Sequence, residues 1–422
     1  MTLLFVNAAA VVTCAGPARA RRGAEMRDAG VRHGVAVGVR GDVIAAVGPL
    51  PALEREFADA ERVDCGGGLL MPGWVDSHTH ALFGRPRFDE QELRAAGLDY
   101  MEIARRGGGI HASVRDLRGR GEDELYVLAA PRLRRLASYG TTTVEVKSGY
   151  GLSVDDELKS LRVIARLARE LPLRLVPTWL GAHEIPLEHR GSPGGRSAYL
   201  RMLVDEMLPR VADERLAQFA DVFCEPGVFT VEESRQVLTA SRAAGLALKL
   251  HADELSGAGG AELAAELAAV SADHLAAVSD AGVAALAASR TVATLLPGTM
   301  LFLGKTKQAP ARALLDAGAA VALASDFNPG TSPTVNFPLM LTLAVSQLRM
   351  SAAEAVLAGT VNGAAALDLA ARVGQIAPGF SADLALYDAE DVRELPYWYG
   401  DRRCRASWTR GKTCHQYELG VV

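Results

Sequence analysis

Eight short apolar runs recur through the middle of this sequence, and most are followed by a longer stretch with helical periodicity. The runs lie near residues 74–77, 143–147, 173–180, 221–224, 247–251, 269–273, 291–295 and 320–325. Eight strands that alternate with helices over about 300 residues are typical of an α/β protein built as a (β/α)8 TIM-type barrel. A doubly wound open sheet is the alternative that the same alternation allows.

The two ends of the chain consist instead of short strands and glycine turns. We expect a first strand over residues 3–12 and a hairpin turn at Gly41-Asp42. The same texture returns in VGQIAPGFSADLALYDAED near the other end. Neither segment is large enough for an independent domain. The sequence therefore predicts one small β-sandwich domain from residues 1–72 plus 376–422, with a catalytic barrel over residues 73–375 inserted between its halves.

Composition excludes several classes of protein. The 422 residues carry 45 Lys and Arg against 50 Asp and Glu, which is not the basic footprint of a nucleic-acid-binding protein. No run of about 18 apolar residues occurs, so we expect no membrane span. The apolar N-terminal run lacks the preceding Lys or Arg of a signal peptide. Five scattered cysteines without a C-x-x-C pair favour a reducing compartment, and we expect a cytoplasmic protein.

Polar side chains gather where the predicted strands end, which is where a barrel of this kind places its active site. The first run ends in DSHTH, residues 76–80, and residues two apart on an extended chain point to the same side. The fifth run ends at His251, the sixth at His274, and the eighth just before Asp326. Three of these four imidazoles with the carboxylate of Asp326 would suit a borderline metal such as zinc or iron and leave a position for water.

Hydrolysis at such a site also needs a group that moves a proton from water to a leaving nitrogen. Glu254 follows the expected ligand His251 by three residues and is the natural proton shuttle. A carboxylate at a helix start is also favoured by the helix dipole alone. His274 could orient or deprotonate the water, hold an oxyanion, or be a buried, hydrogen-bonded histidine.

The segments PGWVDSHTH, HADE, SADH and SDFNPG occur in this order after a small strand region. In this order they resemble the amidohydrolase superfamily of metal-dependent barrel hydrolases. Longer stretches resemble the imidazolonepropionase family within it, namely FGRPRFDEQELRAAGLDYMEIARRGGGIHASVR, TTTVEVKSGYGL, VPTWLGAHEIP, LHADELSGAGGAELAAEL and ASDFNPGTSPT. They run from the first predicted barrel strand to the last, so the resemblance covers nearly the whole chain.

The resemblance implies hydrolysis of 4-imidazolone-5-propanoate to N-formimidoyl-L-glutamate in histidine degradation, by a homodimer. It assigns one divalent or trivalent metal per chain, zinc or iron, to His78, His80, His251 and Asp326. Together with the strand-end argument, this makes Glu254, His274 and Asp326 the predicted catalytic residues. It places the small-molecule substrate against Arg87, Tyr150, His183, Glu254, Asn328, Gly330 and Thr331.

The residues themselves agree with a substrate that carries a carboxylate. Arg87 offers a planar guanidinium just after the H-x-H strand, with Arg85 and Arg105 as nearby rivals. Tyr150 offers a phenol at the pocket rim, or it packs in the core. His183 could hydrogen-bond the ring carbonyl or nitrogen, or supply the electrophile.

Two loops complete the candidate site. Asn328-Pro-Gly330-Thr331 presents an amide, backbone N–H groups and a hydroxyl after the eighth run. Gly107-Gly108-Gly109 is not a phosphate loop, because no strand precedes it and no G-K-[ST] follows. It makes a tight turn or lets backbone approach the ligand.

One metal is expected rather than two. Some amidohydrolases bridge two metals with a carbamylated lysine after the fourth strand, where this chain reads VFCEP. Lys147 and Lys249 lie on the second and fifth strands, which leaves Glu225 as the only candidate bridge. The alternative functions are another cyclic amidase or a deaminase of the same superfamily, and an inactive binding scaffold. The loop residues Arg87, Tyr150 and Asn328–Thr331 favour a carboxylate-bearing substrate over a nucleobase, and the complete ligand set with Glu254 argues against an inactive scaffold.

Overall fold

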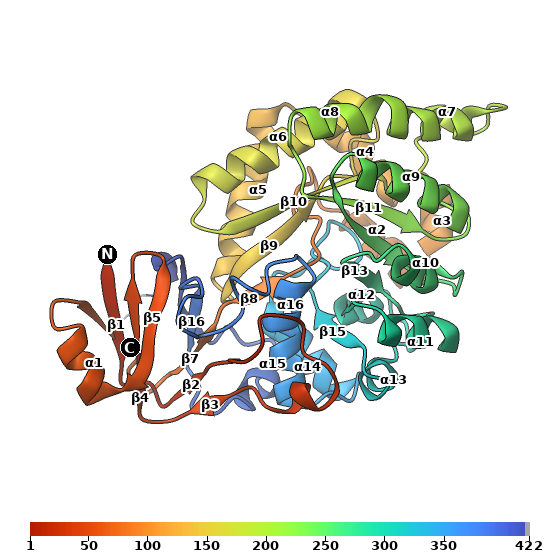
Figure 1. The fold of residues 1–422 in the computed structure, drawn as a ribbon. Coiled ribbons are helices and arrows are strands. Elements are labelled where there is room, and N and C mark those ends of the chain that lie inside the picture. Colours follow the sequence, from red (N-terminus) through yellow and green to blue (C-terminus); the bar gives the residue numbers. More distant parts are fainter. Residues whose placement is uncertain (99, 418–422) are drawn as a thin grey trace.

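The computed structural model describes residues 1–98 and 100–417 (Figure 1). Eight parallel strands form one sheet in which each strand neighbours the next along the chain. They are β8 (Trp74–Asp76), β9 (Thr141–Lys147), β10 (Arg174–Ala182), β11 (Phe219–Cys224), β12 (Ala247–Ala252), β13 (Ser271–His274), β14 (Val292–Leu295) and β15 (Ala320–Leu323). Each coincides with a predicted run, because a parallel strand covered on both faces needs a short, continuous apolar sequence.

The chain just beyond β8 and β15 brings the two edges of this sheet together. The N–H of Asp326 donates to the carbonyl oxygen of His78 at 3.1 Å, and the N–H of His80 donates to the carbonyl oxygen of Phe327 at 2.8 Å. These backbone hydrogen bonds close the barrel at its C-terminal end. Three of the predicted metal ligands therefore lie on the closing seam itself.

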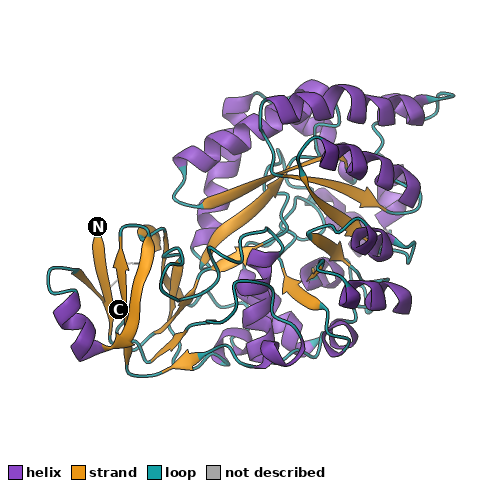
Figure 2. Ribbon diagram, viewed as in Figure 1, coloured by secondary structure: helices purple, strands orange, loops and turns teal. Residues whose placement is uncertain are grey.

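Helices cover the outside of the barrel (Figure 2). In α6 (Val154–Glu170), the Ser153 hydroxyl accepts the Asp156 N–H at the first turn, and one apolar face is buried at Leu158, Leu161 and Ile164. The other helices of the barrel region are α2 (Asp89–Ala95), α3 (Tyr100–Arg105), α4 (Ile110–Arg118), α5 (Glu122–Ala137), η2 (Leu187–His189), α7 (Gly195–Arg201), η3 (Met202–Met207), α8 (Leu208–Asp213), α9 (Val231–Ala243), α10 (Gly260–Glu266), α11 (Asp280–Ala288), α12 (Pro297–Phe302), α13 (Ala311–Asp316), α14 (Phe337–Ser346), α15 (Ala352–Gly359) and α16 (Val361–Ala365).

Strands from both ends of the chain form two further sheets, at the left of Figure 1. One contains β1 (Thr2–Val6), β4 (Val35–Arg40), β5 (Val43–Pro49) and β6 (Glu61–Asp64). The other contains β2 (Ala10–Val12), β3 (Val31–Arg32), β7 (Leu69–Pro72), β16 (Leu384–Tyr387), β17 (Cys404–Thr409) and β18 (Lys412–Gln416). The short helices here are η1 (Gly23–Arg27), α1 (Leu50–Glu56) and α17 (Glu394–Tyr397).

The six-stranded sheet joins the small part of the molecule to the barrel. Leu70 and Leu384 pack into the apolar cluster between the two small sheets, whereas Leu69 and Ala385 pack into the main core of the barrel. Successive strand residues point to opposite faces, so the sheet presents one face to each core. The arrangement confirms the predicted barrel with a β-sandwich built from both termini. A domain boundary at residues 72 and 376 stays a prediction.

The predicted single strand over residues 3–12 is wrong, because this segment forms β1 and β2, which belong to different sheets. The chain changes direction at Asn7, whose φ of 57° lies in the left-handed region that asparagine tolerates better than most residues. The hairpin at Gly41-Asp42 is present between β4 and β5.

Among the described residues no helix is both long and apolar enough to cross a bilayer. All five cysteines lie in the described part of the chain and are free thiols.

Candidate active site

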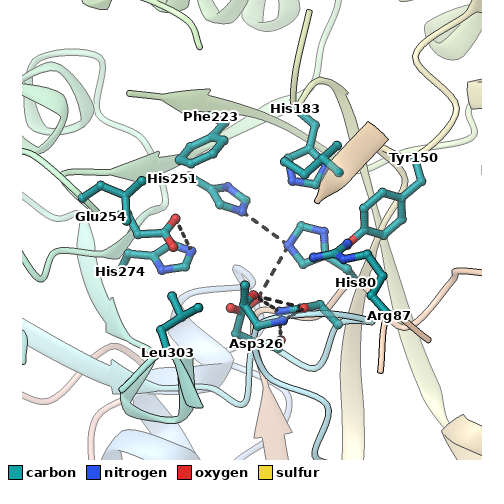
Figure 3. Close-up of a pocket in the computed structure, with 14 residues that line it drawn as sticks. His80, Arg87, Tyr150, His183, Phe223, His251, Glu254, His274, Leu303 and Asp326 are labelled. Carbon is teal, nitrogen blue, oxygen red and sulfur yellow. Dashed lines mark hydrogen bonds and ion pairs between the residues drawn. The ribbon is translucent and has the colours of Figure 1, made fainter. Parts of the chain in front are cut away.

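The three predicted histidine ligands meet Asp326 at the C-terminal ends of the barrel strands, and Figure 3 shows His80, His251 and Asp326 together. The Nε2 atoms of His80 and His251 are 3.4 Å apart. Asp326 Oδ1 lies 3.6 Å from His78 Nε2 and 3.7 Å from His80 Nε2. Two ligand atoms that each lie about 2.1 Å from a tetrahedral ion are about 3.4 Å apart. The spacings therefore fit a single divalent metal ion.

The protonation of these side chains also fits a cation. Burial lowers the pKa of His78 and of His80 well below the usual value, so both rings are neutral and carry a lone pair. Among the described residues, the buried Nε2 of His78 has no hydrogen-bond partner. Thr299 Oγ1 donates to Asp326 Oδ2 at 2.5 Å, which leaves Oδ1 turned to the histidines. A metal would satisfy the lone pairs and the carboxylate together.

Two buried carboxylates in the barrel interior orient the ligand rings. Asp273 Oδ2 lies 2.6 Å from His78 Nδ1, and Asp221 Oδ2 lies 2.9 Å from His251 Nδ1. A carboxylate only accepts, so the hydrogen bond to Asp273 places the proton of His78 on Nδ1 and leaves the lone pair on Nε2. The pairing therefore selects the tautomer in which a metal can be bound.

Two lysines in the barrel interior balance these carboxylates. Lys147 Nζ lies 2.7 Å from Asp221 and 2.8 Å from Glu145, and Lys249 Nζ lies 3.7 Å from both Glu145 and Asp273. All five side chains are fully buried. The two ammonium groups offset the buried carboxylates that contact the ligand rings.

Above the ligands, the strand ends open into a pocket that contains almost all the predicted substrate contacts. Its lining consists of His80, Arg87, Ile110, Tyr150, His183, Phe223, His251, Glu254, Leu255, His274, Leu303, Asp326, Asn328 and Thr331. Gly330 does not line the pocket and lies against the Arg87 guanidinium instead. His78 does not line the pocket, because its side chain is fully buried deeper in the barrel.

Glu254 and His274 face each other across one side of the pocket (Figure 3). Glu254 Oε2 lies 3.5 Å from His274 Nε2. Burial raises the pKa of the Glu254 carboxyl well above its usual value, and the neighbouring Asp326 acts in the same direction. Burial also lowers the pKa of His274. A carboxyl whose pKa is raised in this way can both take up and release a proton.

His183 is held in one tautomer. Its Nδ1 donates to the carbonyl oxygen of Gly149 at 2.8 Å, because a carbonyl oxygen only accepts. Burial lowers the pKa of His183 to about 3, so the ring is neutral and Nε2 carries a lone pair. The ring stacks on His80 at a centroid distance of 5.0 Å and lies 5.3 Å from the ring of Tyr150.

Asn328 organises the loop that follows β15. Its Oδ1 accepts the N–H groups of Gly330 at 2.8 Å and Thr331 at 2.7 Å, and its Nδ2 donates to the Asp326 carbonyl oxygen at 2.7 Å. The backbone N–H groups expected to meet a ligand here are thus used within the loop. The hydrogen bonds hold Thr331 at the pocket wall.

Sequence reasoning missed Glu145, Asp221 and Asp273. A usable signal exists in EVK at 145–147 and KLH at 249–251, where charged residues stand two apart within apolar runs. Such pairs point to one side of a strand, here the barrel interior. The apolar wall of Phe223 and Leu303 carries no comparable signal.

Comparison with known proteins agrees with this site. The chain matches the model of the Amidohydrolase family over residues 85–415. Guanine deaminase of E. coli has the same fold, with a TM-score of 0.75, 14% identity, and coverage of 99% of this chain and 100% of that one. An adenosine deaminase from Xanthomonas campestris with bound zinc gives a TM-score of 0.70 at 20% identity, covering 97% and 92%. The fold and the site thus define an amidohydrolase.

More similar relatives narrow this class. A protein named imidazolonepropionase from Solibacter usitatus (strain Ellin6076) is 43% identical over 413 residues, which cover 98% of each chain. One of the same name from Symbiobacterium thermophilum is 48% identical over 402 residues, covering 94% of this chain and 93% of that one. The chain belongs to the imidazolonepropionase family, as the sequence motifs predicted. It is therefore a hydrolase that acts on a cyclic amide.

The contact between Asp273 and His78 can be tested through metal binding. We expect Asp273→Asn to weaken metal affinity about 10- to 100-fold, because an amide is a poorer acceptor for the His78 Nδ1–H. Elemental analysis after dialysis against graded chelator concentrations measures this, with thermal unfolding as a check on the fold. Asp280→Asn, at an exposed helix start, is the matched control. Wild-type affinity in Asp273→Asn would contradict the orienting role.

Proposed function

We propose that this pocket opens the ring of 4-imidazolone-5-propanoate by hydrolysis to N-formimidoyl-L-glutamate, the imidazolonepropionase reaction. The observation that carries the proposal is the layout of one pocket. Glu254 and His274 lie on one side of it and Arg87 and Tyr150 on the other, with the ligands His80 and His251 between them (Figure 3). A small ring with a carboxylate tail fits between a proton-transfer pair and a guanidinium.

We assign one metal ion per chain, zinc or iron, to His78, His80, His251 and Asp326. When bound, such an ion supplies Lewis acidity and lowers the pKa of a water molecule toward about 7. Glu225 is better suited to holding a loop than to bridging a second metal. Its carboxylate accepts the Leu255 N–H at 3.1 Å and the Ser256 hydroxyl at 2.5 Å, next to Glu254.

Glu254 takes the proton from the attacking water and delivers it to the ring nitrogen that leaves. Its raised pKa suits both halves of this transfer, because the carboxylate is basic enough to accept the proton and the acid still releases it. His274, 3.5 Å away, holds the Glu254 carboxylate and contacts the reacting oxygen.

His183 and Tyr150 orient the ring. Since Nδ1 of His183 is used by Gly149, its Nε2 accepts a hydrogen bond, and a ring N–H is the matching donor. This favours the ring nitrogen over the ring carbonyl among the roles that the sequence leaves open. Tyr150, which is buried in the pocket wall, and the Thr331 hydroxyl complete the polar contacts.

Arg87 binds the propionate carboxylate. A guanidinium presents parallel N–H donors that match the two oxygens of a carboxylate, and Arg87 is buried in the pocket wall. Arg85 is a weaker candidate, because its side chain is 54% exposed and pairs with Asp89.

A deaminase or another cyclic amidase is not favoured, since the relatives compared over nearly the full chain are named imidazolonepropionase. An inactive scaffold is not favoured either, because the ligand residues and Glu254 are all in place. A cytoplasmic homodimer that acts on a small molecule, without nucleic acid or membrane as a partner, stays our prediction.

The reaction itself is the first test. Purified protein is incubated with freshly made 4-imidazolone-5-propanoate, with and without prior chelation, and the products are followed by mass and NMR. We expect gain of one water with ring opening, lost on chelation and restored by zinc or iron. No turnover by metal-replete protein would contradict this substrate.

Glu254→Gln tests the proton transfer. We expect kcat to fall by about 10²- to 10⁴-fold, because the amide cannot carry the proton. Metal content should stay at the wild-type level. Glu266→Gln, on the exposed side of the following helix, is the matched control. A wild-type kcat in Glu254→Gln would remove this residue from the proton path.

Arg87→Lys tests the carboxylate anchor. We expect KM to rise about tenfold or more with a smaller change in kcat, since an ammonium cannot replace the planar pair of donors. Arg85→Lys is the control and should leave KM unchanged. A raised KM in Arg85→Lys but not in Arg87→Lys would transfer the anchor to Arg85.

A further inference from the structure

A buried carboxylate lies directly against the Arg87 guanidinium. Glu90, in the first turn of α2, has Oε1 3.2 Å from Arg87 Nε, and the two side chains are only 7% and 6% exposed. Its second oxygen, Oε2, lies 3.2 Å from Nη2 of Arg94, one turn further along the same helix. Glu90 therefore holds two arginines at once.

The glycine motif at 107–109 completes the surroundings of Glu90. The N–H of Gly109 donates to Glu90 Oε1 at 2.7 Å. A Cβ added at Gly108 would lie 2.7 Å from Ile103 Cγ2 and 3.1 Å from Glu90 Oε1. Only glycine lets this turn approach so closely. The motif thus supplies a backbone donor that fixes the carboxylate.

The guanidinium is confined on its other sides as well. Its Nη1 donates to the Ser113 hydroxyl of α4 at 2.8 Å. A Cβ at Gly330 would stand 1.8 Å from Nη2 and 2.2 Å from Cζ, so the group lies against bare backbone of the loop after β15. The backbone N–H of Arg87 also donates to the Pro329 carbonyl oxygen at 2.8 Å. Three segments distant in the sequence set the place of one side chain.

We infer that Glu90 is a specificity-determining positioning residue, which fixes the Arg87 guanidinium so that the pocket selects imidazolone rings with a carboxylate tail over rings without one. The inference rests on the proposed role of Arg87. A guanidinium held at Nε and Nη1 before the ligand arrives loses little further side-chain entropy on binding. The tail carboxylate then meets a prepared partner.

Glu90→Ala tests this inference. We expect kcat/KM for 4-imidazolone-5-propanoate to fall about tenfold or more, mainly through KM, because the buried ion pair that holds the Arg87 guanidinium is lost. For the tail-less 4-imidazolone ring, kcat/KM should stay within about twofold, since Arg87 has no carboxylate to bind there. Selection for the carboxylate tail is measured by two ratios. The first is kcat/KM for 4-imidazolone-5-propanoate divided by kcat/KM for the tail-less ring. The second is Ki for 3-(imidazol-4-yl)propanoate divided by Ki for imidazole.

Asp89→Ala is the matched control. It removes the same charge from the preceding residue of α2, where the side chain is 69% exposed and pairs with Arg85 at 2.7 Å. It should leave both ratios unchanged. Glu90→Gln keeps the side-chain volume and one acceptor oxygen, so it should shift the ratios in the same direction by less than Glu90→Ala.

The sign of the effect makes the test decisive. Coulomb's law alone predicts tighter binding of a carboxylate once the negative charge beside Arg87 is removed. A lowered or unchanged KM, or an equal loss for both rings, would overturn the inference. Unchanged ratios in Arg87→Lys would instead overturn the proposed anchor. If Arg87→Lys lowers the selection and Glu90→Ala does not, the positioning role alone fails.

Discussion

Five buried charges in the barrel interior hold the histidine ligands, and their burial must be offset within the barrel itself. Lys147 and Lys249 lie among three carboxylates, two of which contact the Nδ1 atoms of His78 and His251. Unpaired, any one of them would cost several kcal/mol in this environment. Paired, they fix the rotamers and tautomers of the ligand rings. The predicted metal ligands therefore lie directly against a buried cluster of ion pairs in the barrel interior.

The closing seam of the barrel connects this core to the pocket. Backbone hydrogen bonds between the segments after β8 and β15 set His78, His80 and Asp326 side by side. The same two segments then continue into the pocket wall, where Arg87 lies against Gly330. Ligand geometry and the place of the proposed carboxylate anchor thus depend on the same few backbone contacts. The small sandwich, which packs on the barrel through β7 and β16, supports the structure from outside the site.

Much of the fold can be predicted from the sequence, because its signals are local. Each barrel strand appears as a short apolar run, and the period of α6 is visible in the spacing of its leucines. The prediction of a single strand over residues 3–12 is wrong, because this signal is also local. Asn7 is the only polar residue between Leu3 and Val12, and one polar residue is too weak a signal to show that the strand divides between two sheets.

For the site, the sequence alone determined which chemical groups stand at the strand ends, including His78, His80, His251 and Asp326, because barrel topology places all those ends on one face. Only the tertiary structure decided how these groups are supported. That Asp273 faces His78, or that Glu90 meets both Arg87 and the N–H of Gly109, depends on contacts between segments far apart in the chain. A local pattern shows that a charge occurs within a strand or helix. The partner that offsets the free energy of burying it is set by three-dimensional packing.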